Sequence, residues 1–242
     1  MNILILRNEA EIGQVLGDLF CALAREKKNA VLGLATGSTP LPSYRRMISR
    51  YKAGDVSFKD VITFNLDEYC GLPADHKNSY RTFMRQELFE QIDILHKNTH
   101  FLDGNTNDER AESERFRRLI ENAGGIDLQL LGIGRNGHIG FNEPSDAFTQ
   151  EAYRTALTES TIAANSVYFD DCPMPRYAMT MGVGSILRAK RIVLVATGEA
   201  KAEAVKAMLE GEVTPGCPAS ALQNHPNTTV YLDPAAAALL SV

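Results

Sequence analysis

The sequence predicts an α/β fold in which one open, mostly parallel sheet carries helices on both faces. Short apolar runs, each of a length that suits a buried strand, alternate along the chain with longer stretches whose apolar residues recur at helical spacing. The runs are almost continuously apolar, which is typical of strands buried on both faces of a parallel sheet. This alternation is that of a Rossmann-like fold, in which ligands bind at the carboxyl ends of the strands.

Each apolar run predicts a strand: 2–6, 30–35, 61–65, 126–133 and 191–197. All of these strands are expected to be buried, the first included. Helices are expected between them, over 9–27, 80–92, 108–122 and 199–210. In the first helix the apolar residues lie three or four positions apart and form the face expected to pack on the sheet: Ile12, Val15, Leu16, Leu19, Phe20 and Leu23.

Composition indicates a globular protein with a sizeable core, because 44% of the 242 residues are hydrophobic and 23% are charged. No Pro/Ser-rich linker, low-complexity tract or fixed-period repeat marks a boundary between domains. We therefore expect one domain over residues 1–242.

Charge and cysteine content argue against several classes of protein. The net charge of −5 provides no positive field for nucleic acid or an anionic membrane. The apolar start of the chain is too short for a membrane span, and no basic region precedes it to make a secretory signal. The cysteines are scattered without a Cys-x-x-Cys pair, which argues against a zinc site, a redox motif or a disulfide framework: Cys21, Cys70, Cys172 and Cys217. A cytoplasmic location is expected.

The segment Leu-Ala-Thr-Gly-Ser-Thr-Pro at 34–40 ends a strand and begins a helix. Gly37 can adopt positive φ, Ser38 or Thr39 can cap the helix, and Pro40 suits its first position. The exposed amides and hydroxyls of such a helix N-terminus favour phosphate. Taken alone, the motif fits a plain capped turn equally well.

The segment Asn-Leu-Asp-Glu-Tyr at 65–69 also follows an apolar run, so it lies near the carboxyl end of a strand. Neighbouring side chains of extended backbone point to opposite faces. Only one of Asp67 and Glu68 is therefore expected to face a ligand, and the spacing does not choose between them. A solvated acidic turn is the commoner role for such a pair.

The segment 131–144 is the most specific, with four glycines in nine positions after an apolar strand. It has little helix or strand propensity and is expected to be a loop that brings backbone close to a ligand. His138 and Glu143 lie close enough in sequence for the carboxylate to orient the imidazole and raise its basicity. A lone loop histidine is usually a surface residue, but this context favours a catalytic one.

A second strand-to-helix turn, at 196–201, carries Lys201 in the first helical turn. A lysine there opposes the helix dipole, so it gains most when an anion binds nearby. The alternative is a lysine paired with Glu199 or with solvent. The other histidines have no spacing typical of a metal site: His76, His96, His100 and His225.

Together the motifs resemble those of the glucosamine-6-phosphate deaminases: Ala-Thr-Gly-Ser-Thr-Pro, Asn-Leu-Asp-Glu-Tyr and Gly-Ile-Gly-Arg-Asn-Gly-His-Ile-Gly-Phe-Asn-Glu-Pro. The resemblance runs nearly end to end and includes 178–182 and 218–223, and it places a last strand near the C-terminus. It implies an enzyme of amino-sugar catabolism that converts glucosamine 6-phosphate and water to fructose 6-phosphate and ammonia.

The resemblance also implies residue roles. Asp67 would be the base that moves a proton between C2 and C1, and His138 would open the sugar ring, oriented by Asn136 and Glu143. The phosphate would be held by Gly37, Ser38, Thr39 and Lys201. No metal and no organic cofactor is implied, and the small-molecule substrate is the expected partner.

Three departures from the family bear on binding and assembly. Some members carry an aspartate where this chain has Asn136, for which we expect an orienting role. The deaminases typically place a phosphate-contacting arginine where Val167 stands, so we expect weakened binding unless Arg154 or Arg176 reaches the same oxygens. The basic residues of the allosteric site in longer, hexameric members are replaced at 153 and 155, so a monomer or small homo-oligomer is expected.

Two alternatives remain at this stage. A 6-phosphogluconolactonase-like hydrolase shares the general architecture but needs no base at C2. A non-catalytic sugar-phosphate sensor is consistent with Val167, although no helix-turn-helix or basic region accompanies the domain.

Overall fold

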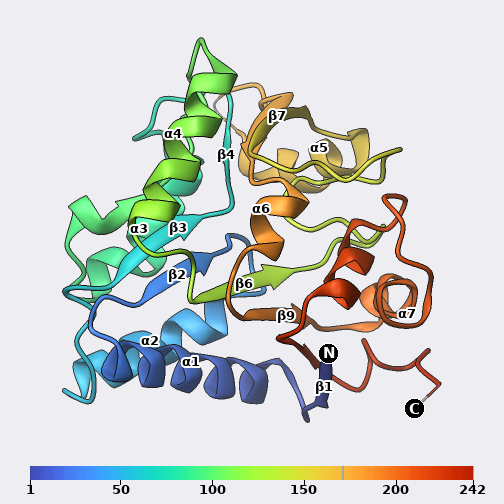
Figure 1. Ribbon diagram of the computed structural model, residues 1–242, viewed down its shortest axis with the longest axis horizontal. Helices are drawn as coiled ribbons and strands as arrows, with labels where there is room; N and C mark the ends of the chain where they lie inside the picture. The colour runs from blue at the N-terminus through green and yellow to red at the C-terminus, as the bar shows by residue number, and fades with distance from the viewer. Residues whose placement is uncertain (171, 242) are drawn as a thin grey trace.

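A seven-stranded sheet, all of whose paired strands are parallel, forms the centre of the protein (Figure 1). The computed structural model describes residues 1–170 and 172–241. In spatial order the strands are β1 (Asn2–Ile5), β10 (Thr228–Leu232), β9 (Ile192–Ala196), β6 (Leu128–Gly132), β2 (Val31–Leu34), β3 (Ile62–Asn65) and β5 (Thr99–His100). The predicted parallel sheet is confirmed.

The helices connect these strands as crossovers. They are α1 (Glu9–Glu26), α2 (Leu41–Lys52), α3 (Tyr80–Glu87), α4 (Glu109–Asn122), α5 (Glu159–Asn165), α6 (Val183–Leu187) and α7 (Ala202–Glu210). Short 3₁₀ segments are η1 (Phe89–Gln91), η2 (His96–Asn98), η3 (Ser166–Tyr168), η4 (Glu199–Lys201) and η5 (Pro218–Asn224). The helix expected over 80–92 ends earlier than predicted because Leu88 leaves helical geometry, with φ −142° and ψ −58°.

Two apolar layers cover the two faces of the sheet, as predicted. The side chains of β9 alternate: Val193 and Val195 pack with residues of α1 and α2, whereas Leu194 packs with residues of α4, α6 and α7. Figure 1 shows α1 and α2 together on one side of the sheet, with α4 and α6 on the other.

Helices α1 and α2 approach closely through two glycines. A Cβ atom on Gly13 would lie 2.3 Å from that of Pro42, and one on Gly17 would lie 2.4 Å from that of Arg46. These glycines turn the buried face of α1 relative to the predicted one, so Val15 is 39% exposed. The placement of Val15 on the packed face was wrong, because the periodicity of large apolar residues does not register glycines.

The expectation that the first strand is buried was also wrong. Within the described residues, strand β1 pairs with β10 alone and lies at the edge of the sheet, so its side chains are exposed, Leu4 by 44%. An apolar run has the same appearance in a central strand and in an edge strand.

A second, antiparallel sheet of three strands was not predicted. It consists of β4 (Asp67–Tyr69), β8 (Tyr177–Thr180) and β7 (Tyr153–Ala156), with β8 in the centre. Leu66 joins the two sheets, since its N–H donates to the Leu34 carbonyl and its own carbonyl accepts from the Met181 N–H. Asp67 therefore lies where the chain leaves the parallel sheet. No helix in the described ranges is long and apolar enough to cross a membrane.

Candidate active site

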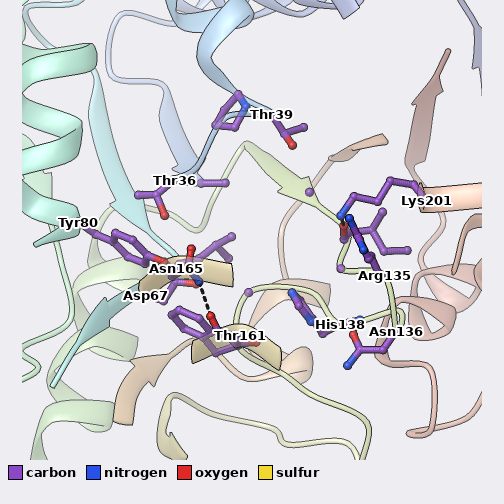
Figure 2. A pocket seen from close by; sticks show the side chains of 18 residues that line it. Thr36, Thr39, Asp67, Tyr80, Arg135, Asn136, His138, Thr161, Asn165 and Lys201 are labelled. Atoms are coloured by element: carbon purple, nitrogen blue, oxygen red, sulfur yellow. Dashed lines mark hydrogen bonds between the residues drawn. The ribbon is translucent and has the colours of Figure 1, made fainter. Parts of the chain in front are cut away.

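A cavity of about 560 Å³ lies at the carboxyl ends of β2, β3 and β6, where the fold class predicts ligand binding (Figure 2). It brings together all four sequence motifs, because its lining residues come from 35–40, 66–67, 132–141 and Lys201. Tyr80, Thr161 and Asn165 complete the lining.

Most of the predicted site residues face this cavity. The lining includes Thr39, Asp67, Asn136, His138 and Lys201. Glu143 lies behind the lining, in contact with two of these residues. Gly37 and Ser38 belong to the loop that carries Thr39 but are not among the lining residues.

The loop before α2 has the predicted glycine geometry but not the predicted cap. Gly37 has a φ of +91°, a conformation that glycine adopts without strain. The residue at the α2 N-cap is Pro40, which forms no side-chain cap, and Leu41 N–H donates to the backbone carbonyl of Ser38. Capping by Ser38 or Thr39 was therefore wrong, and both hydroxyls are left for other partners.

The structure separates the two neighbouring acids. The carboxylate of Glu68 accepts hydrogen bonds from the backbone N–H groups of Tyr69, Tyr80 and Arg81, each at 2.9 Å. Asp67 lies in the cavity wall on the opposite side of the strand. Of the two acids, Asp67 is the one that lines the cavity, and Glu68 has the structural role that the alternation of side chains allows.

Asp67 has an environment that favours the proton-bound form. Burial raises its pKa, and the nearby charge of Glu68 adds to the effect, to about 8. A carboxylate with a pKa in this range accepts a proton from carbon more readily than an ordinary aspartate does. Gly140 lies beside it with a φ of +57°, and a Cβ there would lie only 3.0 Å from Thr180 Oγ1, so glycine suits this position.

Glu143 connects several side chains at the other wall of the cavity. Its Oε2 lies 3.4 Å from His138 Nδ1 and accepts a hydrogen bond from Asn136 Nδ2 at 2.7 Å. Its Oε1 accepts from the Thr161 hydroxyl at 3.0 Å. Burial alone would raise the pKa of Glu143, but His138, Asn136 and Thr161 together lower it to about 2. Glu143 is therefore an anion across the physiological range.

The loop that carries His138 is held by short-range bonds. Gly134 N–H donates to the His138 carbonyl at 2.8 Å, and Gly137 N–H donates to the Gly134 carbonyl at 3.1 Å. A Cβ on Gly134 would lie 2.2 Å from the imidazole ring. Glycine at this position is what lets the ring pack directly on the backbone.

Lys201 forms one end of the cavity. Its Nζ donates to the Ile133 carbonyl at 2.7 Å rather than pairing with Glu199. Burial, followed by the charge of Arg135, lowers the pKa of Lys201. The turn before it is fixed by Asp233, whose carboxylate accepts from the Gly198 N–H at 3.0 Å.

Five lining residues with polar side chains were missed as site residues: Thr36, Tyr80, Arg135, Thr161 and Asn165. Thr36 and Arg135 lie within motifs that the sequence analysis quoted, so a motif-wide search would have found them. The other three come from α3 and α5 and have no local signal, because their position depends on how these helices pack. In the described ranges, no three His, Cys, Asp or Glu side chains cluster as metal ligands.

None of the residues discussed as a phosphate clamp reaches the cavity. Val167 is 75% exposed and lies outside the lining. The Arg154 guanidinium lies over the Tyr177 ring, 4.4 Å from the ring centroid. At the surface, the Arg176 Nη1 atom lies 3.9 Å from the Glu159 Oε1 atom. Neither arginine is among the lining residues.

Comparison with known proteins places this geometry in context. A family model described as glucosamine-6-phosphate isomerases/6-phosphogluconolactonase matches residues 9–231. A glucosamine-6-phosphate deaminase from Shewanella woodyi is 49% identical over 242 residues, which is all of this chain and 92% of that protein. One from Thermoanaerobacter pseudethanolicus is 46% identical over 99% of this chain and 95% of that protein.

Solved structures agree with the sequence comparisons. A structure described as a monomeric glucosamine-6-phosphate deaminase superimposes with a TM-score of 0.94 at 42% identity, covering 99% of this chain and all of that one. A 6-phosphogluconolactonase from Trypanosoma cruzi superimposes with a TM-score of 0.78 at 18% identity, covering all of this chain and 97% of that one. At that identity the second likeness concerns the fold alone.

Proposed function

The chain belongs to the glucosamine-6-phosphate isomerase/6-phosphogluconolactonase family, and we propose that it converts glucosamine 6-phosphate and water to fructose 6-phosphate and ammonia. The observation that carries the proposal is the pairing, across one cavity, of a buried carboxylate with raised pKa, Asp67, and a carboxylate-supported imidazole, His138. The two groups supply the two proton transfers that the reaction needs. The deaminases that are 46% to 49% identical support the same reaction.

Ring opening falls to His138. With Nδ1 turned towards Glu143, Nε2 is left to take a proton from the C1 hydroxyl and to deliver one to the ring oxygen. The anionic carboxylate of Glu143 stabilises the imidazolium that forms in between. Asn136, which donates to the same carboxylate oxygen, keeps Glu143 in place.

Isomerisation falls to Asp67. In the open-chain aldehyde, Asp67 takes the proton from C2 and returns it to C1, while a proton passes from the amine to O1. The C2–N bond thereby becomes an imine and C1 becomes an alcohol. Water then adds to C2 and ammonia leaves, which gives the ketose. Burial without a counter-charge keeps Asp67 basic enough for the first of these steps.

The phosphate would lie between the α2 N-terminus and Lys201. Thr39 and Lys201 line the cavity, and the loop of Gly37 and Ser38 leads into the uncapped first turn of α2. The amides of α2's first turn are paired or absent, since Leu41 and Ser43 donate to backbone carbonyls and Pro42 has no N–H, so the backbone donors to an anion would come from the loop before the helix. With the phosphate fixed, C1 and C2 are held against Asp67, which lowers the entropic part of the barrier.

We also propose that the enzyme acts in the cytoplasm as a monomeric single domain. No disulfide links the four cysteines, all of which are in the described ranges. The similar solved deaminase is described as monomeric.

A product assay tests the proposal against its alternatives. Purified protein would be given glucosamine 6-phosphate and, separately, 6-phosphogluconolactone, with ammonia, fructose 6-phosphate and acid release followed. Ammonia and fructose 6-phosphate in equal amounts from the first substrate are expected. Acid release from the lactone alone would indicate a lactonase, and no turnover of either would favour a sensor.

A further inference from the structure

Two cations face the cavity without a carboxylate partner. Arg135 and Lys201 both line it, and in the part of the chain that the structure describes neither forms an ion pair with an acidic side chain. Arg46 and Arg50, by contrast, are both paired with Asp18. Lys201 is half-buried and Arg135 is exposed at the cavity mouth. A half-buried ammonium is costly unless an opposite charge joins it.

The two cations also act on each other. The charge of Arg135 contributes to the lowered pKa of Lys201, after the effect of burial. Two like charges that line one cavity are both stabilised by a divalent anion bound between them. A guanidinium adds a planar pair of N–H donors that matches two phosphate oxygens, which an ammonium cannot do.

Their place in the cavity suits the far end of a sugar phosphate. Figure 2 shows Arg135 and Lys201 together on one side and Asp67 with Tyr80 on the other. A chain of six carbons with C1 and C2 at Asp67 has its C6 phosphate at the opposite end. The charge distribution of the cavity thus matches the polarity of the substrate.

We propose that Arg135 binds the substrate phosphate as the second cation beside Lys201, and so replaces the arginine clamp that position 167 lacks. The proposal rests on the deaminase function proposed above. It needs neither Arg154 nor Arg176, which lie outside the cavity.

This assignment also couples phosphate binding to ring opening. Arg135 lies in the turn whose ends are joined by the Gly134–His138 hydrogen bond. A phosphate that holds Arg135 therefore holds the turn from which the imidazole projects. The phosphate would both anchor the substrate and fix the His138 loop.

The test compares Arg135→Ala and Arg135→Lys with Arg176→Ala, a matched control at a surface arginine. For Arg135→Ala we expect the Michaelis constant for glucosamine 6-phosphate to rise on the order of tenfold to a hundredfold, as for the loss of a charge-assisted hydrogen bond. The inhibition constant of inorganic phosphate, used as a competitive inhibitor, should rise by a similar factor. The Michaelis constant of Arg135→Lys should lie between those of the wild type and Arg135→Ala. Added guanidinium ion should partly restore substrate binding in Arg135→Ala.

The assignment would be overturned if Arg135→Ala had a Michaelis constant for the substrate and an inhibition constant for inorganic phosphate both within twofold of the wild type. A loss that guanidinium does not relieve and that inorganic phosphate inhibition does not share would overturn it too, since that pattern indicates a structural role. Calorimetric titration with inorganic phosphate separates this question from the activity itself. If the wild type binds phosphate through Arg135 but releases no ammonia, the proposed function fails and the phosphate site stands.

Discussion

Asp67 and Glu68 are adjacent in β4, yet only the Asp67 carboxylate reaches the cavity, while the Glu68 carboxylate accepts three backbone N–H groups around the start of α3. The two acids therefore have different roles in the structure. Glu68 ties β4 to α3, and its charge helps to raise the pKa of Asp67. Asp67 thus owes part of its raised pKa to a neighbour that does not line the cavity.

Replacing Glu68 by Gln should lower the pKa of the catalytic base. The substitution removes the negative charge that disfavours ionisation of Asp67. We expect the acidic limb of the kcat/KM profile to shift to lower pH, together with a loss of stability of about 1–3 kcal/mol from the weakened hydrogen bonds. The profile and a denaturant titration measure the two effects. Glu90→Gln, at an exposed site, is the control, and an unmoved limb would contradict the coupling.

Replacing Asp67 by Asn should stabilise the protein at alkaline pH. The pKa of Asp67 is raised above its unfolded value, so the folded state binds the extra proton and stability declines as pH rises from about 4 to about 8. An amide does not titrate, so the variant avoids this loss of stability. The loss in the wild type is at most roughly 6 kcal/mol. Thermal melting from pH 5 to pH 9 should show a gap in Tm that favours the variant and widens with pH. A constant gap would mean that Asp67 does not titrate in this range.

Replacing Glu143 by Gln should impair ring opening. The anion that stabilises the His138 imidazolium is lost, and we expect kcat to fall on the order of a hundredfold. Because the pKa of Glu143 is lowered to about 2, its contribution to wild-type stability is present above pH 4.5 and is lost only as pH falls towards 2. The kinetics of Glu143→Gln and the exposed control Glu159→Gln measure the effect. Equal rates for both variants would remove Glu143 from the mechanism.

Replacing Gly134 by Ala should displace His138. The added Cβ would lie 2.2 Å from the ring, so the imidazole or the loop must shift. A shift of this size at a catalytic group typically costs on the order of a hundredfold in rate. Gly216→Ala is the matched control, because a Cβ there would lie at an ordinary contact distance of 3.5 Å from its nearest neighbour, Thr214 Oγ1. Wild-type turnover in Gly134→Ala would show that close packing of the ring on the loop is not needed.

The fold was predictable where its causes are local. The strands and most helices follow from the apolar runs, and the parallel sheet follows from their alternation. The exposure of Leu4 was not predictable, because it depends on the position of β1 at the sheet edge. The buried face of α1 was misplaced because Gly13 contributes to packing by having no side chain.

The site was predictable where one motif contains a complete chemical unit. His138, Asn136 and Glu143 lie within eight residues of each other, and the structure keeps them in contact. Thr161 was missed although its hydroxyl donates to Glu143, because α5 reaches the cavity through tertiary packing. The spacing of the residues did not choose between Asp67 and Glu68, and the resemblance alone named Asp67. The position of α3 supplies the physical reason, because it accounts for the Glu68 carboxylate.

The most direct test of the central claim is the release of ammonia and fructose 6-phosphate from glucosamine 6-phosphate by the wild type, Asp67→Asn and the exposed control Asp146→Asn. The account predicts equimolar products from the wild type and the control, and a rate on the order of a thousandfold lower in Asp67→Asn with the fold intact. Ammonia release by Asp67→Asn at the wild-type rate, or none from the wild type at saturating substrate, would contradict it.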